Sequence, residues 1–224
     1  MPIALKFIAA TALLTAVHVL VMTVLGLRLR IAIREVSLGF GPVLLSAGIF
    51  RLRAVPLGGA VLFKDTRAEA IPEGAPPGWV KDAFDHRPRW VQTLLPLAGA
   101  ASLVAMALLL HPGSALASLG HGFVQIVTGG LSPLSTAQPL IAGASHIATL
   151  GFLPLLGVLA AKFAALNLLP LTVMNGGQAL LALLDPAPHE TPRWKQMLMQ
   201  WSVWLFIALA FSWAVAIGFF VLGR

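Results

Sequence analysis

The feature that most constrains this chain is its first apolar run, from about Ile3 to Leu27, which carries a histidine near its middle. As a helix this run is long enough to cross about 30 Å of hydrocarbon. An imidazole inside it is unusual, because lipid offers the ring nitrogens no partner. His18 is therefore expected to face other helices, where it is either hydrogen-bonded inside the bundle or bound to a metal.

The composition identifies the class of protein. The chain has 224 residues, of which 58% are hydrophobic and only 10% charged, with a mean hydropathy of +0.89. A soluble domain carries roughly 25% charged residues, so an integral membrane protein is expected. The absence of cysteine excludes disulfides and thiolate metal ligands. The net charge of +7 does not indicate nucleic acid, because the basic residues lie beside apolar spans. The expected partners are membrane lipid and a transmembrane protein or helix.

Apolar runs and their interruptions predict the fold class, which is a mainly α polytopic membrane protein formed by a single domain over residues 1–224. Residues 36–63 are broken by Gly and Pro, so they predict a short membrane-associated β-hairpin. Residues 65–89 are polar and proline-rich and predict an exposed connector, and residues 114–127 fit an amphipathic surface helix. Four transmembrane helices are expected, at about residues 3–27, 91–110, 147–169 and 203–222.

The distribution of charge predicts the orientation. Residues 28–90 and 185–199 hold twelve of the fifteen Lys and Arg, whereas residues 111–146 hold none. Basic loops remain in the cytoplasm. We therefore expect loop 28–90 with its hairpin to be cytoplasmic and both termini to be outside. The expected location is a bacterial cytoplasmic membrane.

Three motifs occur in a characteristic order. Gly39-Phe40-Gly41 begins 21 residues after His18, and the stretch from Arg53 to Val61 reads Arg-Ala-Val-Pro-Leu-Gly-Gly-Ala-Val. The stretch from Leu166 to Gly177 reads Leu-Asn-Leu-Leu-Pro-Leu-Thr-Val-Met-Asn-Gly-Gly. Together they resemble the H-E-x-x-H, G-F-G, P-L-G-G-Y-V and L-N-L-x-P-x-P-x-L-D-G-G elements of the site-2 protease family, which are intramembrane zinc metalloproteases. The gap between the second and third spans is too short for a PDZ domain, so the resemblance is to a short form.

The resemblance also implies which positions would form a zinc site. His18 matches the first His, Val19 the Glu, Met22 the second His and Asn175 the Asp. A catalytic zinc needs three protein ligands and a base for its water, yet Val19 cannot accept a proton and a Met thioether suits Cu(I). The motifs are thus degenerate, and His18 is the only remaining ligand. We expect no catalytic residue, metal or cofactor, with zinc present only if the chain is active.

The same resemblance implies a groove for a substrate or partner. Its expected residues are Gly39, Phe40, Gly41, Pro56, Gly58, Gly59, Asn167 and Pro170.

Lys162 is a cation inside the third predicted span. Its long side chain could extend toward the cytoplasmic face, which we favour. The alternative is that its charge fills the space left by zinc, facing Asn167, Asn175 and His18. Three further histidines, at positions 111, 121 and 146, match no metal-ligand spacing and are expected to lie at the interface.

Three functions remain to be compared. The favoured one is a catalytically inactive, site-2-protease-like protein (a pseudoprotease) that binds or regulates a membrane partner. The alternative is an active intramembrane zinc metalloprotease with non-standard ligands, which Val19 and Met22 disfavour. A transporter is disfavoured as well, because the spans contain one Lys and no carboxylate for ion coupling.

Overall fold

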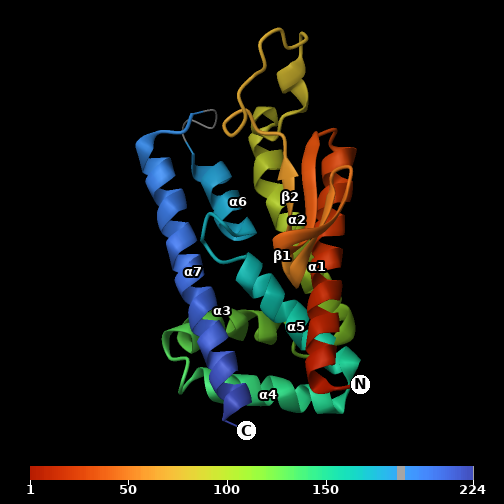
Figure 1. The fold of residues 1–224 in the computed structure, drawn as a ribbon, viewed down its shortest axis with the longest axis vertical. Coiled ribbons are helices and arrows are strands. Elements are labelled where there is room, and N and C mark those ends of the chain that lie inside the picture. Colours follow the sequence, from red (N-terminus) through yellow and green to blue (C-terminus); the bar gives the residue numbers. More distant parts are fainter. Residues whose placement is uncertain (186–189, 224) are drawn as a thin grey trace.

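Apolar helices make up most of the chain, and most of them end where the apolar runs end. The computed structural model describes residues 1–185 and 190–223, without the side chains of residues 56 and 57. The elements in chain order are α1 (Ile3–Arg28), β1 (Ile33–Ala47), β2 (Phe50–Phe63), the 3-10 helices η1 (Trp79–Asp82) and η2 (Phe84–His86), α2 (Arg89–Leu110), α3 (Ala115–Leu131), α4 (Ala137–Leu150), α5 (Phe152–Asn167), α6 (Asn175–Leu184) and α7 (Arg193–Leu222) (Figure 1).

Three helices of the described residues are long and apolar enough to cross a membrane, namely α1, α2 and α7. The predicted count of four is not confirmed, because Gly151 divides the expected third span into α4 and α5. Its φ of +153° is rarely adopted by other residues. Helix α5 has 16 residues, or about 24 Å of rise. Pro154 does not break it, since it lies in the first turn, where proline is tolerated.

Small side chains hold the centre of the bundle together. Helices α1, α2 and α5 pack on one another. The small residues allow close approach of helix backbones, which is how helices associate in lipid. Their buried core includes Ala10, Leu14, Leu103, Ala107, Ala160, Ala161 and Ala164.

Helices α3 and α4 lie across the bundle at the end where both termini are found (Figure 1). The predicted surface helix at 114–127 corresponds to α3, of which only Ala115, Gly122 and Gly129 are buried. Helix α3 packs against α5 and α7. An added Cβ at Gly122 would lie 2.8 Å from the Ala165 side chain. Helix α3 is therefore part of the bundle.

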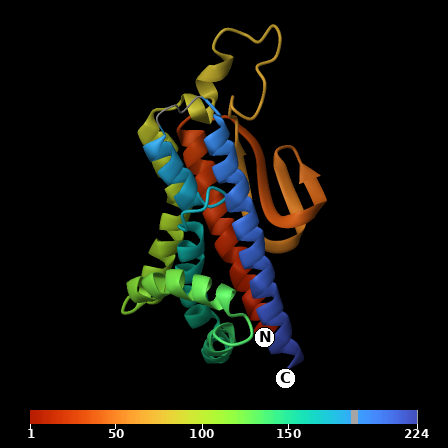
Figure 2. The same ribbon diagram turned by 90° about the vertical axis from the view of Figure 1, so that its left-hand side faces the viewer.

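The predicted strand hairpin is confirmed, and it extends from Ile33 to Phe63. Its two strands bend, so that Val36 pairs with Val61 on one side and with Phe50 on the other. Gly59 carries β2 against α1, since a Cβ there would lie 3.0 Å from the side chain of Val19. The sheet stands to one side of the helices (Figure 2). Apolar side chains that it exposes include Phe40, Val43, Leu44, Leu45, Phe50, Leu52 and Val55.

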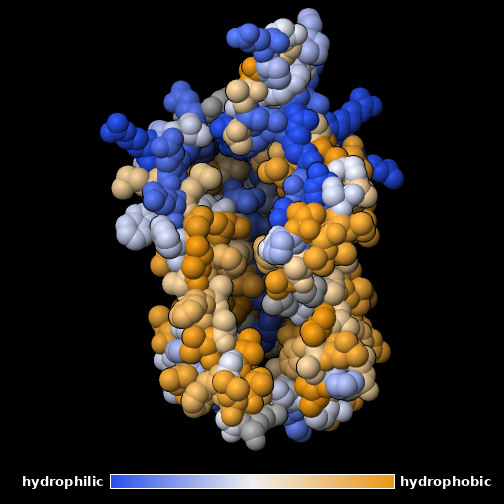
Figure 3. Space-filling model, viewed as in Figure 1, coloured by the Kyte–Doolittle hydropathy of each residue, from blue (hydrophilic) through white to orange (hydrophobic). Residues whose placement is uncertain are grey.

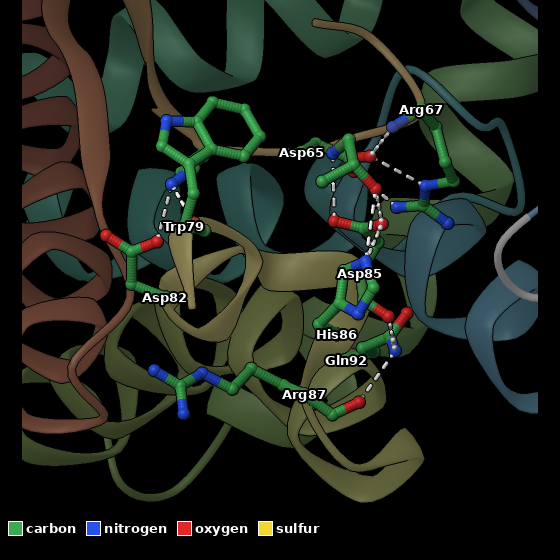
Figure 4. Close-up of polar contacts among 10 residues, drawn as sticks. Asp65, Arg67, Trp79, Asp82, Asp85, His86, Arg87 and Gln92 are labelled. Atoms are coloured by element: carbon green, nitrogen blue, oxygen red, sulfur yellow. Dashed lines mark hydrogen bonds and ion pairs between the residues drawn. The ribbon is translucent and has the colours of Figure 1, made fainter. Parts of the chain in front are cut away.

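The end of the predicted connector is built around two buried charged groups, and we call residues 64–88 the polar cap. Lys64 is 3% exposed, and its Nζ lies 2.6 Å from Asp82 and 3.7 Å from the centre of the Trp79 ring. Its ammonium also donates to the Trp79 carbonyl (Figure 4). This contact pins η1 to the end of β2. Lys64 precedes the predicted connector, and none of residues 65–82 is buried. The expectation of an exposed connector is wrong for Ala83 and Asp85, which are fully buried.

The second buried group of the polar cap is Asp85, which is fully buried. It accepts hydrogen bonds from the backbone N of Thr66, at 3.0 Å, and from the Thr66 hydroxyl. Gln92 of α2 donates from Nε2 to the carbonyls of Asp85 and Arg87, at 2.9 and 2.8 Å (Figure 4). The polar cap is thereby fastened to the first turn of α2.

Candidate functional site

His18 of α1 and Asn175, the first residue of α6, meet inside the bundle although 157 positions separate them. The Asn175 Nδ2 lies 3.2 Å from His18 Nε2. The same amide donates to the Pro96 carbonyl of α2 at 2.6 Å and lies 3.5 Å from the Met22 sulfur. The two zinc-ligand positions that the resemblance implies at residues 18 and 175 therefore lie side by side, and α1, α2 and α6 converge at one point.

Glycines bring the backbones close enough for this meeting. A Cβ at Gly99 of α2 would lie 2.5 Å from His18 Cε1, so the imidazole occupies space that any other residue would fill. Cβ atoms at Gly176 and Gly177 would lie 2.3 and 2.1 Å from the carbonyls of Leu168 and Leu171. The Asn175-Gly-Gly turn therefore packs directly on the segment between α5 and α6.

The hydrogen bond to Asn175 fixes the protonation of His18. Its Nε2 accepts from the amide as oriented, so the neutral ring carries its proton on Nδ1. Nδ1 is buried and has no hydrogen-bond partner among the described residues. Val19 and Met22, at the positions that the resemblance assigns to the base and the second ligand, are 3% and 7% exposed. The space around His18 is thus closed to solvent.

These residues do not fit a catalytic zinc. Protein zinc sites use His, Cys and carboxylate ligands, with an open position for water in the catalytic ones. Here the donors are one imidazole nitrogen already engaged by an amide, one thioether and that amide. Helices α1, α2 and α6 contain no Asp or Glu. Over residues 1–185 and 190–223 no group of three or more His, Cys, Asp or Glu is placed to hold a metal.

The residues expected to form a partner groove fall in three places. Gly39, Phe40 and Gly41 line an open recess of about 370 Å³ on the sheet, beside the ion pair of Glu35 with Arg53.

On β2, a Cβ at Gly58 would meet the Phe40 ring at 2.4 Å, and Gly59 contacts α1. Pro56 lies in β2, and its side chain is outside the described part. Asn167 donates from Nδ2 to the Phe163 carbonyl within α5 at 2.8 Å. Pro170 lines a different recess, between α6 and α7.

Lys162 does not fill the space left by zinc, so that alternative is wrong. Its Nζ donates to the Ser118 carbonyl of α3 at 2.8 Å. Since α3 lies toward the end of the bundle that holds the termini (Figure 1), the favoured extension toward the end that holds the polar cap is wrong as well. The histidines at positions 111, 121 and 146 are exposed and form no metal cluster in the described part of the chain.

Sequence reasoning missed Pro96 and Gly99 as parts of the site. Both lie on the second span, where Leu97-Ala-Gly retains part of the N-A-G-P stretch of site-2 proteases. The retained glycine was the available signal, because a glycine in a helix costs stability unless close packing requires it. The acceptor role of the Pro96 carbonyl has no sequence signal, since every residue has a carbonyl.

Comparison with known proteins gives one family. The sequence model of peptidase family M50 matches residues 6–211, which include both halves of the site and the hairpin. No curated protein matches the chain.

Proposed function

The chain belongs to peptidase family M50, the site-2 protease family, and from this premise we propose that it is a non-proteolytic member which binds or regulates a membrane partner. One observation carries the proposal: His18, the only remaining ligand residue, is engaged at Nε2 by the amide of Asn175. The helices that form the site contain no Asp or Glu that could activate a water molecule. Without zinc or base, hydrolysis lacks both its Lewis acid and its proton acceptor.

The proposal includes a placement in the membrane. The hairpin and polar cap are cytoplasmic, both termini are outside, and α5 serves as the shortened third of four crossings in a bacterial cytoplasmic membrane. The asymmetry of Lys and Arg supports this orientation. The arrangement of the bundle agrees with it, because the termini and α4 lie at the end opposite the polar cap (Figure 1).

The test combines metal content with proteolysis of a transmembrane substrate by the purified chain. We expect far less than one zinc per chain and no cleavage, with His18→Ala indistinguishable from the wild type in both assays. As a positive control, the double variant Met22→His with Asn175→Asp restores a His, His, Asp set at positions already in contact. It should bind zinc.

One result would overturn the proposal in favour of an active protease with non-standard ligands. This is cleavage of the substrate by the wild type, together with about one zinc per chain, both lost in His18→Ala.

A further inference from the structure

Helix α7 is fastened mainly near its two ends. Near its start, Lys195 forms a buried ion pair with Asp185. In its last third, Trp213 Nε1 donates to the Ile126 carbonyl of α3 at 3.0 Å, and Gln138 of α4 donates to the Ala216 carbonyl at 3.2 Å. Only 6% of its most apolar stretch is buried, against 44% for α1 and 33% for α2. The stretch between these fastenings is therefore mostly exposed in the described part of this chain, and Ser202 is its one buried residue.

A furrow separates α7 from the rest of the bundle. Its upper part is a recess of about 180 Å³ between α6 and α7, lined by Leu180, Leu184, Trp194 and Leu198 among others. Figure 3 shows the furrow continuing down between two apolar walls, with hydrophilic atoms on its floor. In Figure 1, α3 and α5 lie behind this part of the furrow. The walls are suited to an apolar helix, but the floor is not purely apolar.

Lys162 is the only charged residue of α5 and the only Lys, Arg, Asp or Glu between Arg89 and Asp185. It is partly exposed. In the described part of the chain its ammonium makes one hydrogen bond, to Ser118, and no ion pair. An ammonium has three donors, so two remain available.

The depth of Lys162 decides what kind of anion can reach it. It lies ten residues after the start of α5, or about 15 Å along the helix axis from the end of the bundle where α4 lies. Because α5 runs obliquely across the bundle in Figure 1, this is the upper limit of its depth within the roughly 30 Å hydrocarbon thickness. Lipid phosphates stay at the bilayer surface, so a carboxylate that approaches Lys162 must be carried into the membrane by a helix.

We infer that Lys162 pairs with an Asp or Glu near the middle of a partner's transmembrane helix, and that this helix lies in the furrow beside α7. The inference rests on the proposed function and adds the chemistry of the partner. A lone cation in the membrane interior pairs preferentially with an opposite charge, because lipid solvates neither. The apolar walls of the furrow contact the rest of the partner helix, and the Lys162 ammonium favours a helix that carries an Asp or Glu.

The test measures binding of designed helices to the full-length chain in phosphatidylcholine liposomes. The probes are Leu/Ala transmembrane peptides of about 23 residues, identical except for a central Glu or Gln. Energy transfer from a dye on Ser135→Cys, the single cysteine of that variant, reports binding. We expect the Glu peptide to bind at least about tenfold more tightly than the Gln peptide.

Three lysine variants locate the effect. Lys162→Met should abolish the preference for Glu, and Lys162→Arg should keep it. Lys6→Met is the matched control, because Lys6 also donates to one helix carbonyl, that of Ala148, but lies near the N-terminus. It should leave the preference unchanged.

The remaining outcomes separate the charge pairing of Lys162 from the binding of a transmembrane helix. Equal binding of the Glu and Gln peptides, or a Glu preference that persists in Lys162→Met, overturns the charge pairing while helix binding stands. Failure of every peptide to bind overturns both the pairing and the proposed binding function.

Discussion

An imidazole is expensive to keep inside a membrane bundle, and a single amide makes it tolerable here. Asn175 donates a hydrogen bond to His18 Nε2, and the same amide contacts the Pro96 carbonyl and the Met22 sulfur. One of the two ring nitrogens of His18 is thereby satisfied. Val19 and Met22 fill the adjoining space without needing partners, and the flexible thioether adapts to the gap that remains.

This pairing makes His18→Ala a stability variant. Removing the ring leaves one buried N–H of Asn175 unsatisfied, which should lower the free energy of unfolding by about 1–3 kcal/mol. The apparent unfolding temperature in detergent measures the loss. His121→Ala is the control, because that imidazole is exposed, and it should change little. Equal effects of the two variants would contradict the importance of the pairing.

Among the elements, the polar cap depends on a charge held away from water. Burial tends to raise the pKa of Asp85, but hydrogen bonds from Thr66 and the charge of His86 outweigh it and hold that pKa below its ordinary value of 3.8. A lowered pKa in the folded state means that the carboxylate contributes its full stability above pH 3.8. The contribution is lost as the pH falls through the lower, folded value.

The polar cap should therefore resist acid to a pH below 3.8 and open only beneath it. Pepsin cleavage within residues 64–88, followed by mass spectrometry from pH 2 to pH 5, measures the opening. Asp85→Ala should cost about 1–3 kcal/mol near neutral pH, because two donors of Thr66 lose their acceptor. Its cleavage should also depend less on pH than that of the wild type, once the intrinsic profile of pepsin is subtracted, because Asp82, paired with Lys64, is then the remaining carboxylate of the cap with a lowered pKa. A wild-type cap that opens near pH 5 would contradict the role of Asp85.

The contact of the sheet with α1 rests on Gly59. A Cβ there would lie 2.5 Å from the Ser37 carbonyl and 3.0 Å from the side chains of Thr15 and Val19. Gly59→Ala should therefore lower stability by about 1–3 kcal/mol through overpacking. Gly143→Ala in α4 is the control, because open space surrounds that position. The difference in apparent unfolding temperature between the two variants is the measurement.

Sequence patterns predicted elements best where hydropathy alone decides them. The long apolar runs of α1 and α2 could only be helices in a membrane. The Gly and Pro residues of 36–63 excluded a membrane-spanning helix there. The run at 147–169 shows the limit, because hydropathy reports an apolar stretch but not a turn within it at Gly151. The buried Asp85 was missed for a related reason: its partner Thr66 is 19 positions away.

At the scale of the whole molecule, the two ends of the bundle differ in charge. We expect the basic end, which holds the polar cap, to lie in the cytoplasm. In this cysteine-free chain, Ser135→Cys should react with an impermeant maleimide added outside intact cells. Lys81→Cys, in the polar cap, should react only after the membrane is broken. The reverse pattern would overturn the proposed orientation.

The His18 ring occupies the space that a side chain at position 99 would fill, and this has a consequence for substitutions at both positions. Glycine is required at position 99 only while the His18 ring lies against it, so positions 18 and 99 are coupled. Gly99→Ala should lower the free energy of unfolding of the wild type but leave that of the His18→Ala variant nearly unchanged. A double-mutant cycle should give a coupling of about 1–3 kcal/mol. Such a coupling would constrain position 18 through packing alone, because loss of the ring is penalised whatever chemistry the imidazole performs.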